Sequence, residues 1–260
     1  MSKTRVNLPQ KKQLWRRLIL LLILGIILII CCLYLSIQIT LPDVSYLKNK
    51  NPKTTALIEQ RKIEAKKAGR KFYLRQQWVS FQQIPELLKR TIRISEDANF
   101  YFHDGIDLEE LEESVKKNIE KGQFARGGST ITQQLAKNLY LSIQKSIWRK
   151  IKEYFIAKRL ESEISKNRIF HIYLNIIELG QGIFGVSAAS HYYFHKSVSH
   201  LDIEEIIRLT AIIPRPLKVD PTRDSKWLLW RCRWITGKLL LYKYIEKAEH
   251  DRLILKFNPE

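Results

Sequence analysis

The chain has 260 residues, with 45 Lys and Arg against 26 Asp and Glu, and a formal net charge of +19. Hydrophobic residues make up 45% and charged residues 27%, which excludes large-scale disorder, collagen and a coiled coil. Three cysteines are too few for a disulfide scaffold. The length suits one domain with an appendage, or two small domains.

An uncharged apolar run near the N-terminus predicts a membrane-spanning helix. The run extends from Leu18 to Leu35. At about 1.5 Å per residue, a helix over residues 18–38 spans the roughly 30 Å hydrocarbon core of a bilayer. A cleaved signal peptide is the alternative, but it has a shorter apolar core and small residues at its cleavage site. The residues from Ser36 to Thr40 are Ser-Ile-Gln-Ile-Thr, so we expect a retained anchor.

The charges on either side of this run predict its orientation. Six basic residues and no acid precede it: Lys3, Arg5, Lys11, Lys12, Arg16 and Arg17. The positive-inside tendency predicts a cytoplasmic tail over residues 1–17, with everything after Thr40 outside. Subtracting these six charges from +19 leaves +13 on the outer part. We expect such a domain to meet anionic lipid head groups or a phosphate-bearing lipid, and not nucleic acid.

Beyond the anchor, the pattern is mostly helical. A polar, basic juxtamembrane segment over residues 39–70 contains a short predicted helix at 56–68, and residues 72–81 are compatible with one strand. Apolar residues at helical spacing predict further helices at 84–96, 107–120, from 129 or 130 onward, and at 146–165, 166–177, 186–195, 201–213 and 225–247. Asp107, with Glu110 three residues later, is a predicted N-cap. The sequence therefore predicts one mostly α domain over residues 71–260.

An acidic residue beside a group of aromatic side chains is the first candidate for chemistry. Glu96 stands where a helical pattern ends, and Phe100, Tyr101 and Phe102 follow it. A carboxyl group in an apolar wall is suited to general acid or base catalysis near neutral pH. The alternative is a solvated surface acid, which the aromatic neighbours disfavour only modestly.

The second candidate is a segment with paired glycines and several polar side chains: Gly127, Gly128, Ser129, Thr130, Gln133, Gln134, Lys137 and Asn138. The glycines permit close backbone approach to a ligand, and Ser129 or Thr130 can cap a helix whose free N–H groups attract anions. Gln133, Gln134 and Lys137 then share a face and form a cradle for phosphate. The spacing matches neither a P-loop nor a nucleophile elbow. An ordinary capped helix with a polar face is the alternative.

The third candidate is a basic pair followed by an acid, Arg149, Lys150 and Glu153. Arg149 and Glu153 are four residues apart and share a helix face, so an i,i+4 ion pair worth a few tenths of a kcal/mol is the simpler interpretation. A second functional carboxylate in a basic setting is the other interpretation. Spacing alone favours the ion pair.

Taken together and in this order, these segments resemble the signatures of the peptidoglycan glycosyltransferase family. The first, E-D-x-x-F-x-x-H-x-G, is met by Glu96, Asp97, Phe100, His103 and Gly105. The second, G-G-S-T-I-T-Q-Q, is met by residues 127–134 and is highly specific. The third, R-K-x-x-E, is met by Arg149, Lys150 and Glu153.

The fourth signature, K-x-x-I-L-E-x-Y-L-N, is met only in part. The chain keeps Lys166, Ile169, Tyr173, Leu174 and Asn175. Phe170 and His171 stand where the family has Leu and Glu, so we assign no catalytic role to position 171. The resemblance covers roughly residues 72–220, and we expect a member without a transpeptidase domain.

The resemblance implies a lysozyme-like, two-lobed helical domain behind a single N-terminal transmembrane helix, with the smaller lobe dipping into the membrane. It also implies polymerisation of lipid II into glycan strands at the outer face of the bacterial inner membrane, with inversion at C1 and release of undecaprenyl diphosphate. The implied partners are lipid II, the growing strand, the membrane and other cell-wall synthesis proteins.

By motif position, the resemblance assigns roles to individual residues. Glu96 is the expected general base on the acceptor's sugar hydroxyl, and Glu153 is the expected second catalytic carboxylate, near the donor diphosphate. Some family members hold Mg²⁺ or Mn²⁺ there, and the requirement varies. The expected substrate-binding residues are Asp97, Phe100, His103, Ser129, Thr130, Gln133, Gln134, Lys137, Arg149, Lys150 and Asn175.

Two other functions fit parts of the sequence. A glycan-cleaving enzyme on a similar fold uses a Glu to protonate the sugar oxygen, but its substrate has no phosphate to bind in a cradle of cations and amides. A non-catalytic membrane scaffold has no need of the intact Glu96 and Glu153. The polymerising enzyme is therefore the favoured function.

Overall fold

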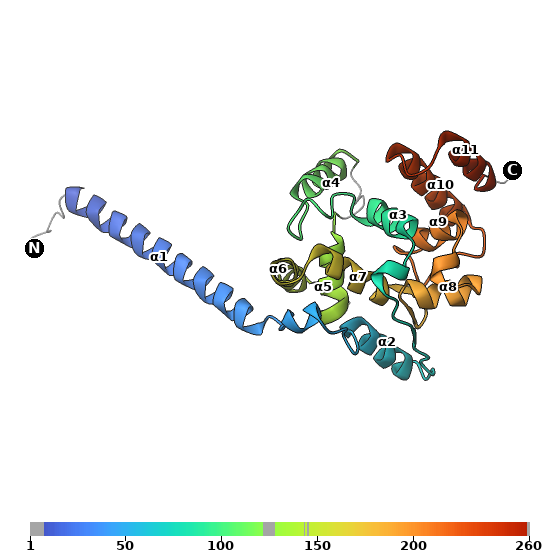
Figure 1. Ribbon diagram of the computed structural model, residues 1–260. Helices are drawn as coiled ribbons and strands as arrows, with labels where there is room; N and C mark the ends of the chain where they lie inside the picture. The colour runs from blue at the N-terminus through green and yellow to red at the C-terminus, as the bar shows by residue number, and fades with distance from the viewer. Residues whose placement is uncertain (1–7, 122–127, 143, 145, 259–260) are drawn as a thin grey trace, which may run out of the picture. The chain divides into compact units, whose positions relative to one another are not determined.

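The computed structural model describes residues 8–121, 128–142, 144 and 146–258 (Figure 1). The chain divides into two units, residues 1–42 and 43–260. The described part contains eleven α-helices and three short strands, which confirms the prediction of a mostly α protein.

The described residues of the first unit form one long helix, α1 (Leu8–Thr40). Pro9 lies in its first turn, where a missing backbone N–H costs nothing, and Leu and Ile dominate the rest. Residues 12–40 have a mean hydropathy of 3.4 in their most apolar window, and none of that window is buried by protein. A helix of this length and composition can cross a membrane.

The second unit begins with a 3₁₀ turn (Ser45–Lys48) and helix α2 (Ala56–Lys67), which confirms the predicted short helix. The Thr55 hydroxyl oxygen accepts the Ile58 N–H at 3.1 Å and caps α2. Helix α3 (Glu86–Glu96) follows, and its apolar face is buried up to Ile94. Its last residue is Glu96, as the helical pattern predicts.

Helix α4 (Leu108–Lys121) begins at the predicted cap, because Asp107 Oδ1 accepts the Glu110 N–H at 2.9 Å. Helix α5 (Ile131–Tyr140) is capped by Thr130 in a reciprocal arrangement with Gln133. Residues 122–127, between α4 and the cap of α5, lie outside the described residues. The remaining helices are α6 (Ile147–Glu163), α7 (Lys166–Ile176), α8 (Val186–Phe194), α9 (Ile203–Ala211), α10 (Lys226–Leu241) and α11 (Lys247–Lys256).

The single helix predicted over residues 225–247 is wrong, because the chain turns between α10 and α11. The Tyr244 N–H donates to Leu239 O at 2.8 Å and the Lys243 N–H donates to Leu240 O at 2.9 Å, the pattern of a Schellman cap. Lys243 takes the left-handed conformation, with φ +57°, that glycine usually occupies there. A lysine at this position gave no sequence signal for the helix end.

The strand compatible with residues 72–81 is reduced to two residues, β1 (Arg75–Gln76). It pairs in parallel with β3 (Ile183–Phe184), which pairs on its other side with antiparallel β2 (Glu178–Gly180). The ladder stops after Phe184 because Gly185, with φ +82°, turns the chain into α8. Because β3 has only two residues, it cannot pair with a longer β1.

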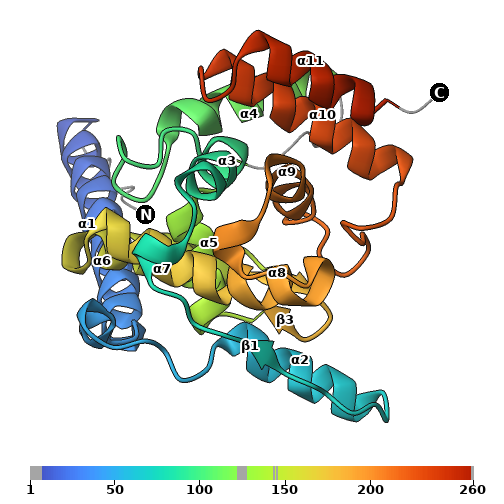
Figure 2. The ribbon, with the colours of Figure 1, turned by 45° about the vertical axis from the view of Figure 1, so that its right-hand side comes forward.

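The helices around α3 and α5 position the site. Helix α5 packs against α2, α6 and α7, while α9 and α10 pack against α3 and against each other, as Figure 2 shows. Buried aliphatic and aromatic side chains, including Leu135, Ile92 and Tyr173, fill the interfaces. The C-terminal end of α3 and the N-terminal half of α5 are therefore held rigidly from both sides.

Candidate active site

A cavity of about 650 Å³ lies among α3, α4, α5 and α10. Its wall includes Glu96, Ser129, Gln134 and Lys137 from the first two predicted motifs, and also Asn99, Glu109, Glu110, Glu113, Lys238 and Tyr242. A second cavity of about 220 Å³ shares Gln134, Lys137, Ile213 and Pro214 with the first. The polar side chains of Gln134 and Lys137 therefore stand at the junction of the two cavities.

Glu96 is the last residue of α3, and its side chain is only 9% exposed. Its Oε2 accepts a hydrogen bond from Gln134 Nε2 at 3.2 Å. Its Oε1 accepts from Arg231 Nη2 at 3.3 Å. The carboxylate therefore lies in the wall of the cavity and is fixed from α5 on one side and α10 on the other.

The amide of Gln134 is itself oriented from behind. The Tyr173 hydroxyl, fully buried in α7, donates to Gln134 Oε1 at 3.0 Å. Burial, together with the charges of Glu96 and Asp97, raises the pKa of Tyr173 well above its usual value, so the hydroxyl keeps its proton. Because the Gln134 oxygen is engaged by this donor, its nitrogen is the atom turned toward Glu96.

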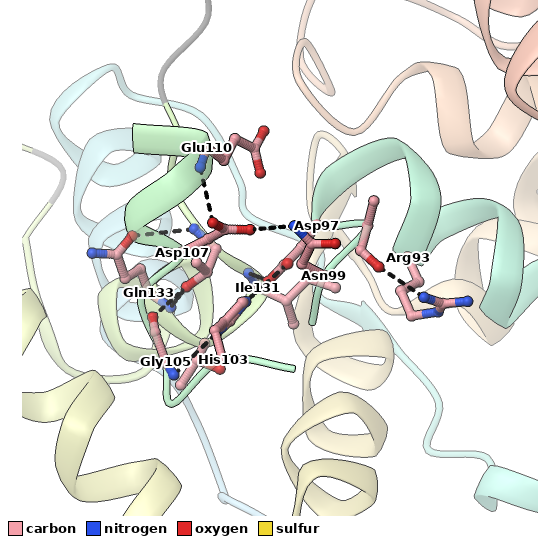
Figure 3. A network of polar contacts seen from close by, with 12 residues as sticks. Arg93, Asp97, Asn99, His103, Gly105, Asp107, Glu110, Ile131 and Gln133 are labelled. Carbon is pink, nitrogen blue, oxygen red and sulfur yellow. Dashed lines mark hydrogen bonds and ion pairs between the residues drawn. The ribbon is translucent and has the colours of Figure 1, made fainter. Parts of the chain in front are cut away.

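A buried network joins the loop after α3 to the start of α5 (Figure 3). Asp97 Oδ2 accepts the Ile131 N–H at 2.9 Å, and Asp97 Oδ1 lies 3.0 Å from His103 Nε2. His103 Nδ1 accepts the Gly105 N–H at 3.1 Å, so its proton is on Nε2 and donates to Asp97. The Asp97 carboxylate also faces the positive end of α5. Asp97 and His103 thus lock the first motif to the second.

Four other predicted binding residues lie in the interior and contact protein groups. Thr130 donates from Oγ1 to Gly105 O at 2.6 Å, Gln133 Oε1 accepts the Thr130 N–H, and Asn175 Oδ1 accepts the Val79 N–H at 2.9 Å. Phe100 is fully buried, with Lys166 Nζ 4.5 Å from its ring centre. In this structure these residues hold the site in shape, and substrate contact by them stays a prediction.

The third motif forms a compact cluster of charges on α6. Glu153 is 3% exposed, and its Oε2 accepts from Arg149 Nη1 at 2.6 Å. Lys150 Nζ donates to Glu153 Oε1 and also to Ser129 Oγ, the latter at 3.0 Å. The predicted i,i+4 ion pair is therefore present, and Lys150 ties it to the loop before α5.

Lys137 is the cation of this region that the described residues leave without a hydrogen-bond acceptor. Burial lowers the pKa of its ammonium, and the neighbouring Arg149 and Lys150 lower it further, whereas Glu153 and Glu96 raise it. An ammonium held among other cations in a partly buried position is stabilised by an incoming anion. Lys137 therefore offers a binding group for negative charge at the junction of the two cavities.

The donor sets do not fit the divalent cation that the resemblance allows. Both carboxylate oxygens of Glu153 already accept from cations, which would repel a metal ion. Asp97, His103 and Asp107 do bring ligand atoms within 4.8 Å of one another. Those atoms, however, are engaged by one another and by Ile131, Gly105, Glu110 and Asn99. Neither group of residues therefore fits a divalent cation.

Sequence reasoning missed Arg231, which reaches the site from α10, 135 residues after Glu96. One signal was available, because Arg231 falls on the helix face that Leu228, Cys232 and Ile235 bury. An arginine at a buried position requires an acidic or polar partner. The sequence does not say which acid that partner is.

His171, which replaces the family's usual Glu, lies apart from the cavity walls. Its Nε2 is 2.8 Å from Val79 O and its Nδ1 is 3.1 Å from Arg168 Nη1. The carbonyl requires a donor and the guanidinium requires an acceptor, so the ring is neutral with its proton on Nε2. Burial lowers the pKa of His171, in keeping with this assignment. His171 therefore joins α7 to the segment before α3.

The comparisons with known proteins agree with these motifs. The family model described as Transglycosylase matches residues 64–240. The biosynthetic peptidoglycan transglycosylase of Nitrosospira multiformis is 41% identical over 197 residues, which cover 76% of this chain and 86% of the relative. The protein of the same description from Laribacter hongkongensis is 39% identical over 75% of this chain and 86% of its own length. A third, from Janthinobacterium sp. (strain Marseille), is 37% identical over 86% of this chain and 96% of its own length.

Proposed function

The chain belongs to the transglycosylase family and is a peptidoglycan glycosyltransferase, and from this premise we propose that it polymerises lipid II. The acceptor is a lipid II molecule and the donor is the growing lipid-linked strand. The reaction inverts C1 of the donor from α to β and releases undecaprenyl diphosphate.

Glu96 is the general base in this proposal. The acceptor's 4-hydroxyl oxygen attacks C1 while its proton passes to the Glu96 carboxylate, and the C1–O bond to the diphosphate breaks on the opposite face of the sugar. Proton transfer to a positioned carboxylate contributes typically 10²–10⁴-fold to a rate. The support is geometric, because Glu96 lines the cavity with both of its oxygens held in place.

The cations near α5 stabilise the departing diphosphate. Lys137 is available to bind it directly, and Arg149 and Lys150 add positive charge beside it. The buried Nε of Arg149 has no partner among the described residues and is a further donor. Groups aimed at developing negative charge are worth most when they are pre-positioned. Glu153 supplies that positioning by holding two cations that would otherwise repel each other.

A membrane location fits the substrate. Helix α1 can span a bilayer, and the catalytic unit carries an exposed apolar groove on α6, formed by Ile147, Lys150, Ile151, Tyr154 and Phe155. Apolar side chains flanked by lysines are typical of surfaces that enter the head-group region. We propose the bacterial inner membrane, with the N-terminus cytoplasmic and the catalytic unit periplasmic. Confining enzyme and lipid substrate to one surface raises their effective concentration.

The observation that carries the proposal is the placement of Glu96 and Lys137 in the wall of one cavity. The test is to incubate the full-length protein in detergent or liposomes with purified lipid II, and separately with finished sacculi. Growth of glycan strands from lipid II supports the proposal. Release of soluble fragments from sacculi, with no strand growth, would identify a glycan-cleaving enzyme. No turnover of either substrate by folded protein would favour the scaffold.

A further inference from the structure

Arg231 is a buried cation in the middle of α10, with 2% of its surface exposed. Removing a guanidinium from water costs several kcal/mol unless partners compensate for the lost solvation. Arg231 is not among the residues that line either cavity beside Gln134. Its partners must therefore explain why it is buried here.

Those partners lie at the C-terminal end of α3. Arg231 Nη2 donates to Ser95 Oγ at 2.9 Å and to Glu96 Oε1 at 3.3 Å. The guanidinium carbon of Arg231 lies 4.2 Å from the centre of the Trp234 ring. This cation–π contact holds the plane of the guanidinium, whose N–H groups form a fork of donors. Ser95 Oγ is also 3.3 Å from Glu96 Oε1, so one carboxylate oxygen faces two donors.

Helix α10 holds the same end of α3 at a second point. Lys238 Nζ donates to Ile94 O at 3.1 Å, two residues before Glu96. Ile94 O is one of the carbonyls that the end of a helix leaves without an intrahelical partner. Arg231 and Lys238, two turns apart on α10, thus fix both the backbone and the carboxylate of the last turn of α3.

We propose that Arg231 is a positioning residue for the general base: it holds Oε1 of Glu96 so that Oε2 is the atom presented to the acceptor hydroxyl beside Gln134. The inference rests on the proposed role of Glu96. A glutamate at a helix end has several rotamers, and in most of them the carboxylate leaves the position beside Gln134. Arg231 selects one rotamer and remains bonded to Oε1 while the proton arrives on Oε2.

This role predicts a specific kinetic signature. Arg231 touches the base and lines no cavity wall, so its loss lowers kcat and leaves KM almost unchanged. In the full-length protein, Arg231→Ala should lower the kcat of lipid II polymerisation by roughly ten- to a hundredfold, the scale of a misplaced catalytic group. KM should change by less than about threefold.

Added guanidinium should restore part of the lost rate. The substitution leaves a hollow next to Glu96, and millimolar guanidinium ion can occupy it and donate to Oε1, as the native fork does. Ammonium ion has the charge without the planar fork and should restore less. Arg231→Lys should likewise recover only part of the kcat of the native enzyme.

The matched control is Arg208→Ala on α9. Arg208 is also a poorly exposed arginine, but its partners are Glu204, Asp224, the Pro221 carbonyl and the Phe257 ring, none of which lines the cavity beside Glu96. Circular dichroism and thermal unfolding show whether each variant folds. Folded Arg208→Ala should keep its kcat and should not respond to guanidinium.

Three results would overturn the inference: full kcat in folded Arg231→Ala, a loss that guanidinium does not relieve, or an equal loss in Arg208→Ala. If Arg231→Ala does not fold, the test is made with folded Arg231→Lys. Full kcat in Arg231→Lys would then show that Arg231 does not position Glu96. Failure of the proposed function is distinct, because the wild-type protein would then be inactive on lipid II.

Discussion

Gln134 and Glu96 are 38 residues apart in the sequence, and their side chains meet at 3.2 Å in the wall of the cavity. The first belongs to the segment that follows the paired glycines and the second to the acidic motif at the end of α3. The buried Asp97–Ile131 bond, also between these motifs, keeps them in register. The contact makes one site out of two motifs that the sequence presents separately.

Tyr173→Phe tests how far the orientation of Gln134 matters. The substitution removes the donor to Gln134 Oε1 and leaves the amide free to turn. We expect a loss of about 1 kcal/mol, or roughly fivefold in kcat, measured as the rate of lipid II polymerisation. Tyr193→Phe removes a similar bond, to Leu179 O, and is the control. Equal polymerisation rates for Tyr173→Phe and Tyr193→Phe would show that the hydrogen bond from Tyr173 to Gln134 does not contribute to catalysis.

Lys137→Ala should weaken binding or the chemical step by roughly 1.5–3 kcal/mol, the scale of a hydrogen bond to a charged group. Polymerisation rates over a range of lipid II concentrations measure this loss. Lys137→Arg, which keeps the charge, should retain most of the affinity. A negligible effect of the alanine variant would place Lys137 outside the substrate contacts.

The lowered pKa of Lys137 also predicts how kcat/KM falls at alkaline pH, that is, the alkaline limb of the pH profile. Burial lowers the pKa of its ammonium below the usual 10.5, so the charge is lost at a lower pH than in a solvent-exposed lysine, as the pH rises through the lowered value. The kcat/KM of the wild type should fall in that range, and the limb should move to higher pH in Lys137→Arg because arginine stays protonated. An unchanged limb in Lys137→Arg would assign it to another group.

His171 predicts a dependence of stability on pH. Its pKa is lowered from 6.5 in the folded chain, so the unfolded chain takes up the proton first as the pH falls. The stability is therefore fully present above 6.5 and is lost as the pH drops through the folded value. His171→Gln keeps a donor for Val79 O and removes the titration, so its free energy of unfolding should fall less between about pH 7.5 and 5. His200→Gln, at an exposed position, is the control. If the free energy of unfolding of His171→Gln falls with pH as steeply as that of the wild type, the pH dependence does not come from His171.

Local chemistry made part of the fold predictable. The caps at Asp107 and Thr130 depend on residues three positions away, and the anchor depends on a continuous apolar run, so both can be found in the sequence. The end of α10 depends on Lys243 in a left-handed conformation, which its residue type does not favour. The two-residue β1 depends on the length of a partner strand more than a hundred positions later.

The candidate site, like the fold, could be predicted from the sequence only in part. Motif residues identified the cavity, but their pattern does not say which side chains face it: Gln134 and Lys137 do, whereas Gln133 turns back to cap α5. That choice depends on how α5 is rotated against α6 and α7. Arg231 belongs to a helix outside the four motifs, and only packing of α10 against α3 brings it to Glu96.

The most direct test of the central claim compares wild type and Glu96→Gln on purified lipid II. The amide keeps the shape of the side chain and one acceptor oxygen, so it loses the contact with either Gln134 or Arg231, and it cannot accept the proton. Glu86→Gln, at the other end of the same helix, is the matched control for an acid on α3. We predict strand growth in the wild type and in Glu86→Gln, and none in Glu96→Gln, which should still fold and bind the lipid. Substantial turnover by Glu96→Gln would contradict the claim that Glu96 is the general base.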